Sequence, residues 1–249
     1  MQRFTDKIAL ITGAASGIGR AVAERLVQEG AAVFCVDIQA GPLEAAVAKL
    51  RESGARAQAF VCDVGDETQV KACVMKCIAV YQRLDVLCNM AGILKFAHTH
   101  EMPLDLFDLV MKVNVTGTFL FCREALPELI KTKGNIVNAA STAALQGLPW
   151  GAAYGASKGA ILAMTRSIAV DYAVHGVRAN CVAPGDILTA IAANTTFPEG
   201  ADMKMLQRIS SLSGAKGPEA VSGVIAMLAS DDGIHITGEC IRIDGGTLA

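Results

Sequence analysis

Short apolar runs alternate with segments of helical spacing along almost the whole chain, and this alternation restricts the folds open to it. Runs rich in β-branched residues predict buried strands, whereas apolar residues that recur every three or four positions predict helices. Strands that alternate with helices form βαβ units, in which the sheet is parallel and helices cover both faces. We therefore expect an α/β fold with a doubly wound, Rossmann-type sheet of about seven strands.

The predicted strands are 7–12, 32–37, 56–62, 84–88, 135–140, 177–183 and 239–243. The predicted helices are 17–29, 43–52, 67–81, a long region around 104–130, 152–175 and 218–229. Residues 186–216 show no strand pattern; a stretch this long is usually a lid or binding loop, and a plain surface excursion is the alternative. No linker or repeat interrupts the pattern, so we expect a single domain over residues 1–249 that carries a substrate lid at 186–216.

Composition argues against several classes of protein. The formal net charge is -2 and no basic block stands out, so nucleic acid is not an expected partner. The longest uncharged run, 135–157, contains polar residues and Pro149, and the N-terminal segment lacks the apolar stretch of a signal peptide, so no membrane association is expected. The eight cysteines and four histidines show no metal-binding spacing; we expect no metal site, and reduced thiols in a cytoplasmic protein.

The first predicted strand runs into a glycine-rich turn, and a predicted helix follows it. Glycines permit a tight turn and let the backbone approach a pyrophosphate, while the helix N-terminus offers unpaired N–H groups to that anion. Glycines alone are weak evidence, and a turn without a ligand is the alternative, but the strand–turn–helix context favours a dinucleotide site. The expected contacts in this turn are Gly13, Ser16, Gly17, Ile18 and Gly19.

Asp37 ends the second predicted strand and is followed by Ile38, which is a further expected cofactor contact. A carboxylate at this position accepts hydrogen bonds from the adenosine ribose and repels a 2′-phosphate, so it favours NAD over NADP. A capping or turn aspartate is the alternative reading.

Further motifs follow in order along the chain. They are Thr12-Gly-x-x-x-Gly-x-Gly19, Asp63-Val64, Asn89-Met90-Ala91-Gly92, Asn114, Ser141, Tyr154-x-x-x-Lys158, Pro184-Gly185, Thr189, and the terminal Ile236-Thr237-Gly238 and Ile243-Asp244-Gly245-Gly246. Over essentially the whole chain, this series resembles the classical single-domain branch of the short-chain dehydrogenase/reductase family. Met90 departs from the second asparagine of the family's segment, which leaves a backbone role open at that position.

The resemblance implies an enzyme that transfers a hydride between NAD(H) and a secondary alcohol or ketone, working as a homo-oligomer, a tetramer or a dimer. Asn114, Ser141, Tyr154 and Lys158 fall at the family's catalytic positions. Besides the glycine turn, Asp37 and Ile38, the implied cofactor contacts are Asp63, Val64, Asn89, Ala91, Gly92, Tyr154, Lys158, Pro184, Gly185, Ile187 and Thr189.

Tyr154 and Lys158 are four residues apart in a predicted helix, so they share one face. A nearby ammonium favours the phenolate and is expected to lower the tyrosine's pKa from about 10, so that the phenol exchanges a proton with the substrate oxygen. In the family the lysine also binds the nicotinamide ribose. Ser141 is expected to hold the substrate oxygen, and Asn114 takes the family's role in a water relay. Taken alone, Tyr-x-x-x-Lys is more often an ordinary amphipathic helix pair, and it is Ser141 and the glycine turn that favour the catalytic reading.

Asp186 departs from the apolar or aromatic residue that the family usually places after Pro-Gly. It either caps the following helix or meets a polar group of the substrate. The rest of the lid is apolar, which favours a cyclic or steroid-like alcohol, although ordinary packing is the alternative. The expected substrate contacts are Ser141, Ala143, Leu148, Tyr154, Asp186 and Leu188.

A different class of function is an NAD-binding sensor or scaffold without turnover. Fold alone does not separate it from an enzyme, but the presence of Ser141, Tyr154 and Lys158 favours the enzyme. The glycine spacing and short length disfavour an epimerase or dehydratase of the extended branch.

Overall fold

Seven parallel strands form one sheet in the computed structural model, which describes residues 2–189, 191 and 195–249. The strands are β1 (Ile8–Thr12), β2 (Ala32–Asp37), β3 (Ala57–Val61), β4 (Val86–Asn89), β5 (Asn135–Ala139), β6 (Arg178–Pro184) and β7 (Cys240–Ile243). Their order is β3-β2-β1-β4-β5-β6-β7, and every neighbouring pair is parallel. The order reverses between β1 and β4, and sheets of this kind bind ligands beyond the carboxyl ends of the strands at such a point.

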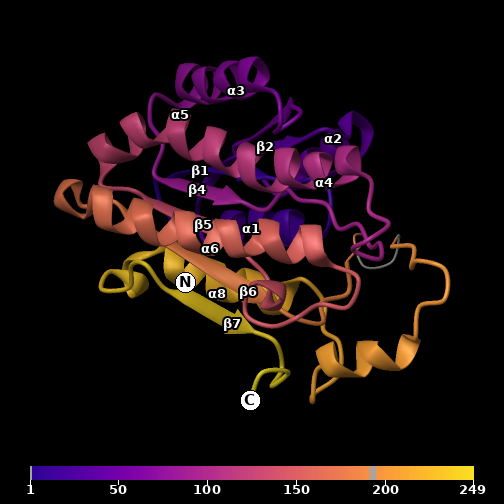
Figure 1. Ribbon diagram of the computed structural model, residues 1–249. Helices are drawn as coiled ribbons and strands as arrows, with labels where there is room; N and C mark the ends of the chain where they lie inside the picture. The colour runs from indigo at the N-terminus through magenta and orange to yellow at the C-terminus, as the bar shows by residue number, and fades with distance from the viewer. Residues whose placement is uncertain (1, 190, 192–194) are drawn as a thin grey trace.

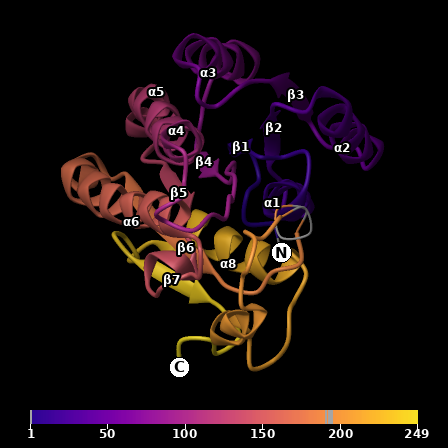
Figure 2. The same cartoon turned by 45° about the vertical axis from the view of Figure 1, so that its right-hand side comes forward.

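Helices cover both faces of this sheet (Figures 1 and 2). One face carries α1 (Gly17–Gln28), α2 (Ala40–Glu52) and α8 (Glu219–Ala229). The other carries α3 (Glu67–Tyr81), α4 (Leu104–Met111), α5 (Gly117–Thr132) and α6 (Ala152–Tyr172). Short 3₁₀ segments are η2 (Thr142–Ala144), η3 (Ala173–His175), η4 (Met203–Ile209) and η5 (Asp231–Gly233). The predicted doubly wound α/β fold is confirmed.

The strands separate two hydrophobic cores because successive side chains of a strand point to opposite faces. Ala9 and Ile11 of β1 pack with α1, α2 and α8, whereas Ile8 and Leu10 pack with α3 and α5. All five residues of β1 are buried. A central parallel strand therefore appears in the sequence as a continuous apolar run, without the alternation of a half-exposed strand.

The long helical region predicted at 104–130 is interrupted in the structure. A π-helical turn, η1 (Lys112–Thr116), stands between α4 and α5 and contains the buried Asn114. A π turn closes its hydrogen bonds one residue later than an α turn, and such turns occur frequently at functional sites. The helix therefore changes phase where it carries a predicted catalytic residue.

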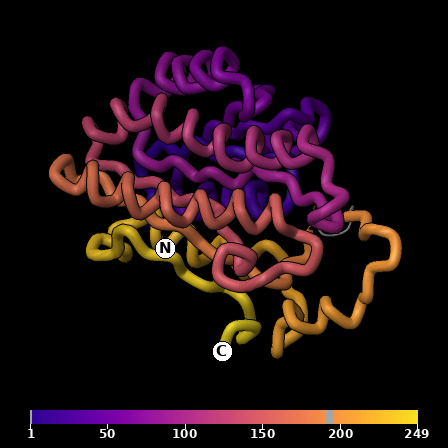
Figure 3. Tube along the Cα trace, in the orientation of Figure 1, coloured from indigo at the N-terminus to yellow at the C-terminus, as the bar shows by residue number. Residues whose placement is uncertain are grey.

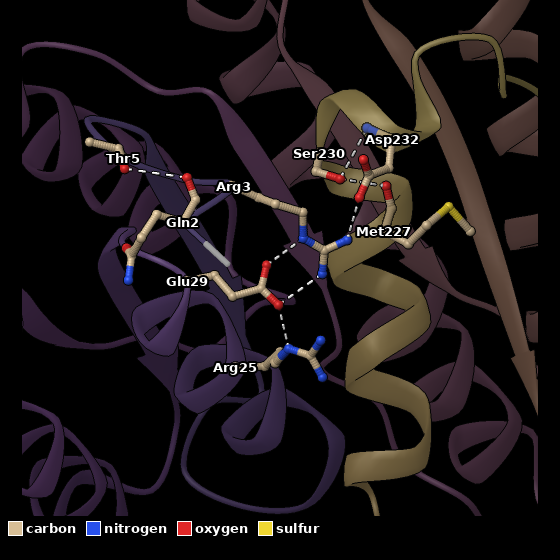
Figure 4. Close-up of polar contacts among 8 residues, drawn as sticks. All are labelled: Gln2, Arg3, Thr5, Arg25, Glu29, Met227, Ser230 and Asp232. Carbon is tan, nitrogen blue, oxygen red and sulfur yellow. Dashed lines mark hydrogen bonds and ion pairs between the residues drawn. The ribbon is translucent and has the colours of Figure 1, made fainter.

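An ion-pair cluster fixes the start of the chain at the amino end of the sheet (Figure 4). The Arg3 guanidinium donates to both carboxylate oxygens of Glu29, at the end of α1, and to Asp232 Oδ2 of η5 at 2.8 Å. Arg25 also donates to Glu29. The hydrogen bond from Arg3 holds the pKa of the Glu29 carboxyl below its ordinary value. These contacts tie α1 to the segment after α8 at the end of the molecule away from the glycine turn.

The predicted lid projects from the body of the molecule as the orange excursion in Figure 3. Residues 190 and 192–194 of the lid lie outside the described part of the chain. Asp186 is described, but the cap that is one of its two expected roles would involve those residues. The base of the lid is a parallel bridge between Ile187 and Lys216, in which Leu188 N–H donates to the Lys216 carbonyl at 2.8 Å. Among the described residues, no helix combines the length and apolar character needed to cross a membrane.

Candidate active site

The glycine turn connects β1 to α1 at the carboxyl edge of the sheet, with Ser16 as the N-cap of α1. Gly13 has φ +68°, and a Cβ there would lie 2.9 Å from the Ala91 amide nitrogen. A Cβ at Gly19 would overlap the Gly13 carbonyl oxygen. The Ser16 side chain makes no capping bond to the first turn of α1. The turn is therefore a close-packed backbone surface at a helix N-terminus, which suits a dinucleotide pyrophosphate.

Thr12 links this turn to the end of β4. Its hydroxyl oxygen accepts hydrogen bonds from the amides of Met90 (3.0 Å) and Ala91 (3.1 Å). The Met90 side chain is buried in the core on the α1 face. Met90 thus connects β4 to the glycine turn through its backbone N–H. A backbone role of this kind was left open by the replacement of the family's asparagine.

The Asn89 side chain points away from the solvent edge. It is buried, and its amide nitrogen donates to Asn138 Oδ1 of β5 at 2.9 Å. Asn138 in turn donates to Thr165 of α6 at 3.0 Å. This chain of buried side-chain hydrogen bonds ties β4, β5 and α6 together beneath the site.

Asp37 ends β2, and Asp63 lies two residues after the neighbouring β3, on the adenine side of the expected cofactor. The buried Asp37 carboxylate accepts from Ala15 N–H of the glycine turn at 3.1 Å and from Gln39 N–H at 3.0 Å. Asp63 Oδ1 accepts from Gly65 N–H at 2.8 Å. Val64 is buried and Ile38 is 62% exposed at this rim. The Asp37 carboxylate therefore stands beside the glycine turn, held there by two backbone amides.

Lys158 is held beneath the carboxyl edge by α6 and β5. The buried amine donates to the Ala139 carbonyl at 2.7 Å and lies 5.6 Å from the centre of the Tyr154 ring. Gly92 lies next to it, since a Cβ on that glycine would be 3.5 Å from Lys158 Nζ and 3.2 Å from Asn114 Oδ1. Lys158, Asn114 and the loop after β4 are thus brought together.

Asn114 fixes that loop through its whole side chain. Its Oδ1 accepts from Ile93 N–H at 2.8 Å, and its Nδ2 donates to the Ile93 carbonyl and the Ser157 hydroxyl, each at 3.0 Å. Ser141 stands at the start of η2, where its hydroxyl accepts from Ala143 N–H at 3.1 Å and interacts with the Tyr154 phenol. The four predicted catalytic residues therefore converge from η1, the end of β5 and α6.

The two ionisable groups of this set carry opposite pKa shifts. Burial raises the pKa of the Tyr154 phenol above its ordinary value, and the hydrogen bond with Ser141 lowers it in part. Burial lowers the pKa of the Lys158 amine to about 8. The prediction that Lys158 lowers the pKa of Tyr154 is wrong for the protein alone, because desolvation disfavours the charged form of both groups.

The Lys158 amine is expected to titrate near pH 8 in the protein without cofactor. A free lysine titrates near 10.4, so between about pH 8 and 10 the unfolded chain binds more protons, and this group's contribution to the free energy of unfolding rises with pH. The Cε and Nζ NMR shifts measure the midpoint, with Lys158→Met identifying the signal. A midpoint above about 10 would contradict the prediction.

The remaining predicted contacts surround the same edge. Gly185, after β6, approaches β7 so closely that a Cβ there would lie 2.9 Å from Asp244 Cα. The Thr189 methyl group lies over Gly17, with 3.5 Å to a Cβ built on that glycine. Among the expected substrate contacts, Leu148 packs over Gly151 and Leu188 is 63% exposed. The segment that starts the lid thus reaches the glycine turn.

Three aromatic rings, which sequence reasoning did not connect with one another, join the lid to the body. Phe197 of the lid stacks on Phe96 with centroids 5.1 Å apart, and Trp150 meets both rings edge-on at 5.8 and 6.2 Å. His98 Nε2 is 3.0 Å from the Glu199 carbonyl oxygen. These residues come from three loops without periodicity, so no local pattern linked them. We call Phe96, Trp150 and Phe197 the aromatic cluster.

Comparisons with known proteins agree with this geometry. The family model described as "short chain dehydrogenase" matches residues 7–199. The chain is 39% identical to 3-oxoacyl-[acyl-carrier-protein] reductase FabG of Thermotoga maritima over 99% of both chains. It is 37% identical to 3beta-hydroxysteroid dehydrogenase of Mediterraneibacter gnavus, covering 99% of this chain and 96% of the relative.

A solved structure, NAD+-bound xylitol dehydrogenase, superimposes with a TM-score of 0.90 at 34% identity, covering 98% of this chain and all of the other. All three proteins are named as reductases or dehydrogenases, and their named substrates differ. The chain belongs to the short-chain dehydrogenase family.

Proposed function

We propose that this chain catalyses NAD-dependent interconversion of a secondary alcohol and its ketone. The observation that carries the proposal is the convergence of four side chains at the carboxyl edge of the sheet, beside the glycine turn and the Asp37 carboxylate. Those side chains are Asn114, Ser141, Tyr154 and Lys158. When bound, the nicotinamide supplies the hydride acceptor or donor, and the protein supplies position and a path for the proton.

Tyr154 is the proposed proton donor and acceptor. Because burial keeps its pKa above the ordinary value, the phenol is protonated at neutral pH and suited to donate to a ketone oxygen. In the reverse direction the phenol must first ionise, so alcohol oxidation gains from a rise in pH. Ser141, which interacts with the phenol, holds the substrate oxygen and stabilises developing charge there.

Lys158 and Asn114 form the proposed route between the site and solvent. Lys158 is positioned to donate to the nicotinamide ribose, while its bond to Ala139 fixes the amine under Tyr154. Asn114 holds the Ile93 backbone at both its N–H and its carbonyl. In this arrangement Asn114 positions the loop that lies over Lys158 and supports a water relay to the amine.

NAD is the proposed cofactor because of the Asp37 charge, and Asp37→Asn tests it. This change removes the charge and keeps one oxygen acceptor for the amides of Ala15 and Gln39. We expect the ratio of kcat/KM for NAD to that for NADP to fall by about tenfold to hundredfold, since a hydrogen bond to a charged group contributes about 1.5–3 kcal/mol. Steady-state kinetics with both cofactors measure it. A wild-type protein that prefers NADP would contradict the assignment.

The proposed substrate class is an apolar cyclic alcohol or ketone. Trp150 lies in the loop just before α6, the helix that carries Tyr154, and Phe197 of the lid stacks on Phe96 beside it. If these aromatic faces line the substrate's path, they favour a flat or ring-shaped apolar body. The exposed lid residues Leu188 and Met203 add apolar surface.

Phe197→Ala is expected to raise KM for a cyclic ketone by roughly tenfold, because it removes the stacked ring that anchors the lid. For a short open-chain ketone the change in KM is expected to be less than about threefold, and kcat is expected to change little in both cases. Leu212→Ala is the matched control, since Leu212 is on the lid and 82% exposed. Equal effects on both ketones would refute a ring-binding role.

The proposal as a whole is tested by following NADH absorbance with a panel of cyclic, steroid, polyol and thioester-linked alcohols and ketones. Turnover of any secondary alcohol or ketone supports it. Cofactor binding measured by calorimetry, without turnover across the panel, favours the NAD-binding sensor instead.

We also propose that the protein is cytoplasmic and forms a homo-oligomer, a tetramer or a dimer. The eight cysteines are free thiols, which suits a reducing compartment. Large apolar side chains are exposed on the outer faces of α4, α5 and α6, and exposed apolar patches mark association surfaces. They are Leu104, Leu109, Phe119 and Val170.

A further inference from the structure

Two cysteines are direct neighbours on adjacent parallel strands. Cys181 of β6 is in register with Cys240 of β7. Residues paired in register point to the same face of a sheet, and both side chains pack in one small cluster beneath α6 with Ala140 and Ile161. The two thiols therefore lie side by side in a shared environment.

The two thiols differ in access to solvent. β7 is the edge strand of the sheet, and Cys240 is partly exposed, whereas the other seven cysteines, Cys181 included, are buried. A small reagent from solvent thus reaches Cys240 first, and Cys181 is positioned behind it as a second thiol.

Charge at the pair favours reaction at Cys240. The hydrogen bond from the Cys181 thiol lowers the pKa of Cys240, and the Arg166 guanidinium lowers it further, against the effects of burial and Glu239. The same hydrogen bond raises the pKa of Cys181. Because the thiolate is the reactive form, the exposed member of the pair is also the better nucleophile.

We propose that Cys240 and Cys181 form a redox-active thiol pair that a hydroperoxide converts reversibly to a disulfide. The Cys240 sulfur attacks the O–O bond of hydrogen peroxide, which yields a sulfenic acid on Cys240 and releases one water. The Cys181 thiol then attacks that sulfenic sulfur, forming the S–S bond and releasing a second water. Two thiols are oxidised by two electrons and one peroxide is reduced to two waters.

Strand geometry allows this bond. Neighbouring strands lie about 4.7–4.9 Å apart, and disulfides span Cα separations of about 4.4–6.8 Å. A disulfide in a reducing compartment is usually transient and redox-sensing. The pair therefore differs from a structural disulfide in that its reduced form is the resting state.

The bond would form close to the proposed active site. Pro184 ends β6, the strand that carries Cys181, and Cys181 packs in one cluster with Ala140, the residue before Ser141. Cross-linking β6 to β7 is therefore expected to lower turnover reversibly. This consequence rests on the proposed function, whereas the cross-link does not.

The test is peroxide treatment of the reduced, full-length protein, followed by digestion without reductant and mass spectrometry. The expected product is a peptide linking Cys181 to Cys240, lighter by two hydrogens and separated again by dithiothreitol. The Cys62–Cys73 pair is an internal control, because both thiols are adjacent but fully buried and should stay reduced.

Two variants separate the steps. Cys181→Ser should leave a sulfenic acid on Cys240 that dimedone traps, and Cys240→Ser should leave Cys181 unmodified. Wild-type protein in which Cys240 stays reduced, remains a sulfenic acid, or pairs with another cysteine would overturn the proposal. Because mass spectrometry detects the cross-link itself, this result does not depend on whether the protein turns over any substrate.

Discussion

Tyr154→Phe is expected to reduce kcat for ketone reduction by about 10³-fold, because a positioned proton donor contributes roughly 10²–10⁴ to the rate. The change removes one oxygen and keeps the ring that packs above Lys158. NADH binding, measured by fluorescence titration, should change by no more than about fivefold, since an uncharged hydrogen bond contributes about 1 kcal/mol. The variant would thus bind NADH but lack the group that donates the proton to the ketone oxygen.

Tyr172→Phe is the matched control, because Tyr172 ends the same helix far from the glycine turn and makes the same chemical change. We expect its kcat to stay within about twofold of the wild-type value. Residual activity above a tenth of the wild-type rate in Tyr154→Phe would show that another group carries the proton.

Gly19→Ala is expected to abolish NAD binding and to lower the free energy of unfolding by about 3 kcal/mol, since overpacking a tight site costs about 1–3 kcal/mol or more. The new methyl group would overlap the Gly13 carbonyl oxygen, which is backbone and has no rotamer to escape into. The turn must open, and this removes the surface offered to a pyrophosphate. Urea denaturation and calorimetric titration with NAD measure the two effects.

Gly41→Ala provides the comparison. Gly41 lies in the first turn of α2, and a Cβ there meets nothing within 4 Å. Alanine favours a helix over glycine by up to about 1 kcal/mol, so this variant should be as stable as wild type or more so, with unchanged NAD binding. Tight NAD binding by Gly19→Ala would show that the turn is not the pyrophosphate site.

The sheet was predictable because its central strands are buried on both faces. A short apolar run such as β1 is typical of a buried strand, and the glycine turn that follows marks the end of the strand. The position of Asp37 was equally predictable, since it closes a strand that pairs with β1. Local pattern and tertiary structure agree at these positions, so the sequence alone identifies the edge of the sheet at which we propose that the cofactor binds.

Other features depend on contacts between distant segments. The aromatic cluster joins Phe96, Trp150 and Phe197, which only the folded chain brings together. The Tyr154 pKa was predicted in the wrong direction because helical spacing shows that Lys158 is near but does not show how deeply both groups are buried. Cys181 and Cys240 likewise become neighbours only through the strand order.

The π turn at Lys112–Thr116 makes the length of this helix functionally significant. An α-helix advances by about 100° per residue, so deleting one residue within the turn would let α4 and α5 merge into a regular helix. Either Asn114 would then rotate away from Ile93 and Ser157, or the whole of α5 would rotate out of its packing against the sheet. A substitution in this segment leaves the helical phase unchanged, whereas an insertion or a deletion shifts it. The extra residue is therefore a constraint on how this chain can change in length during evolution, independent of which side chains it carries.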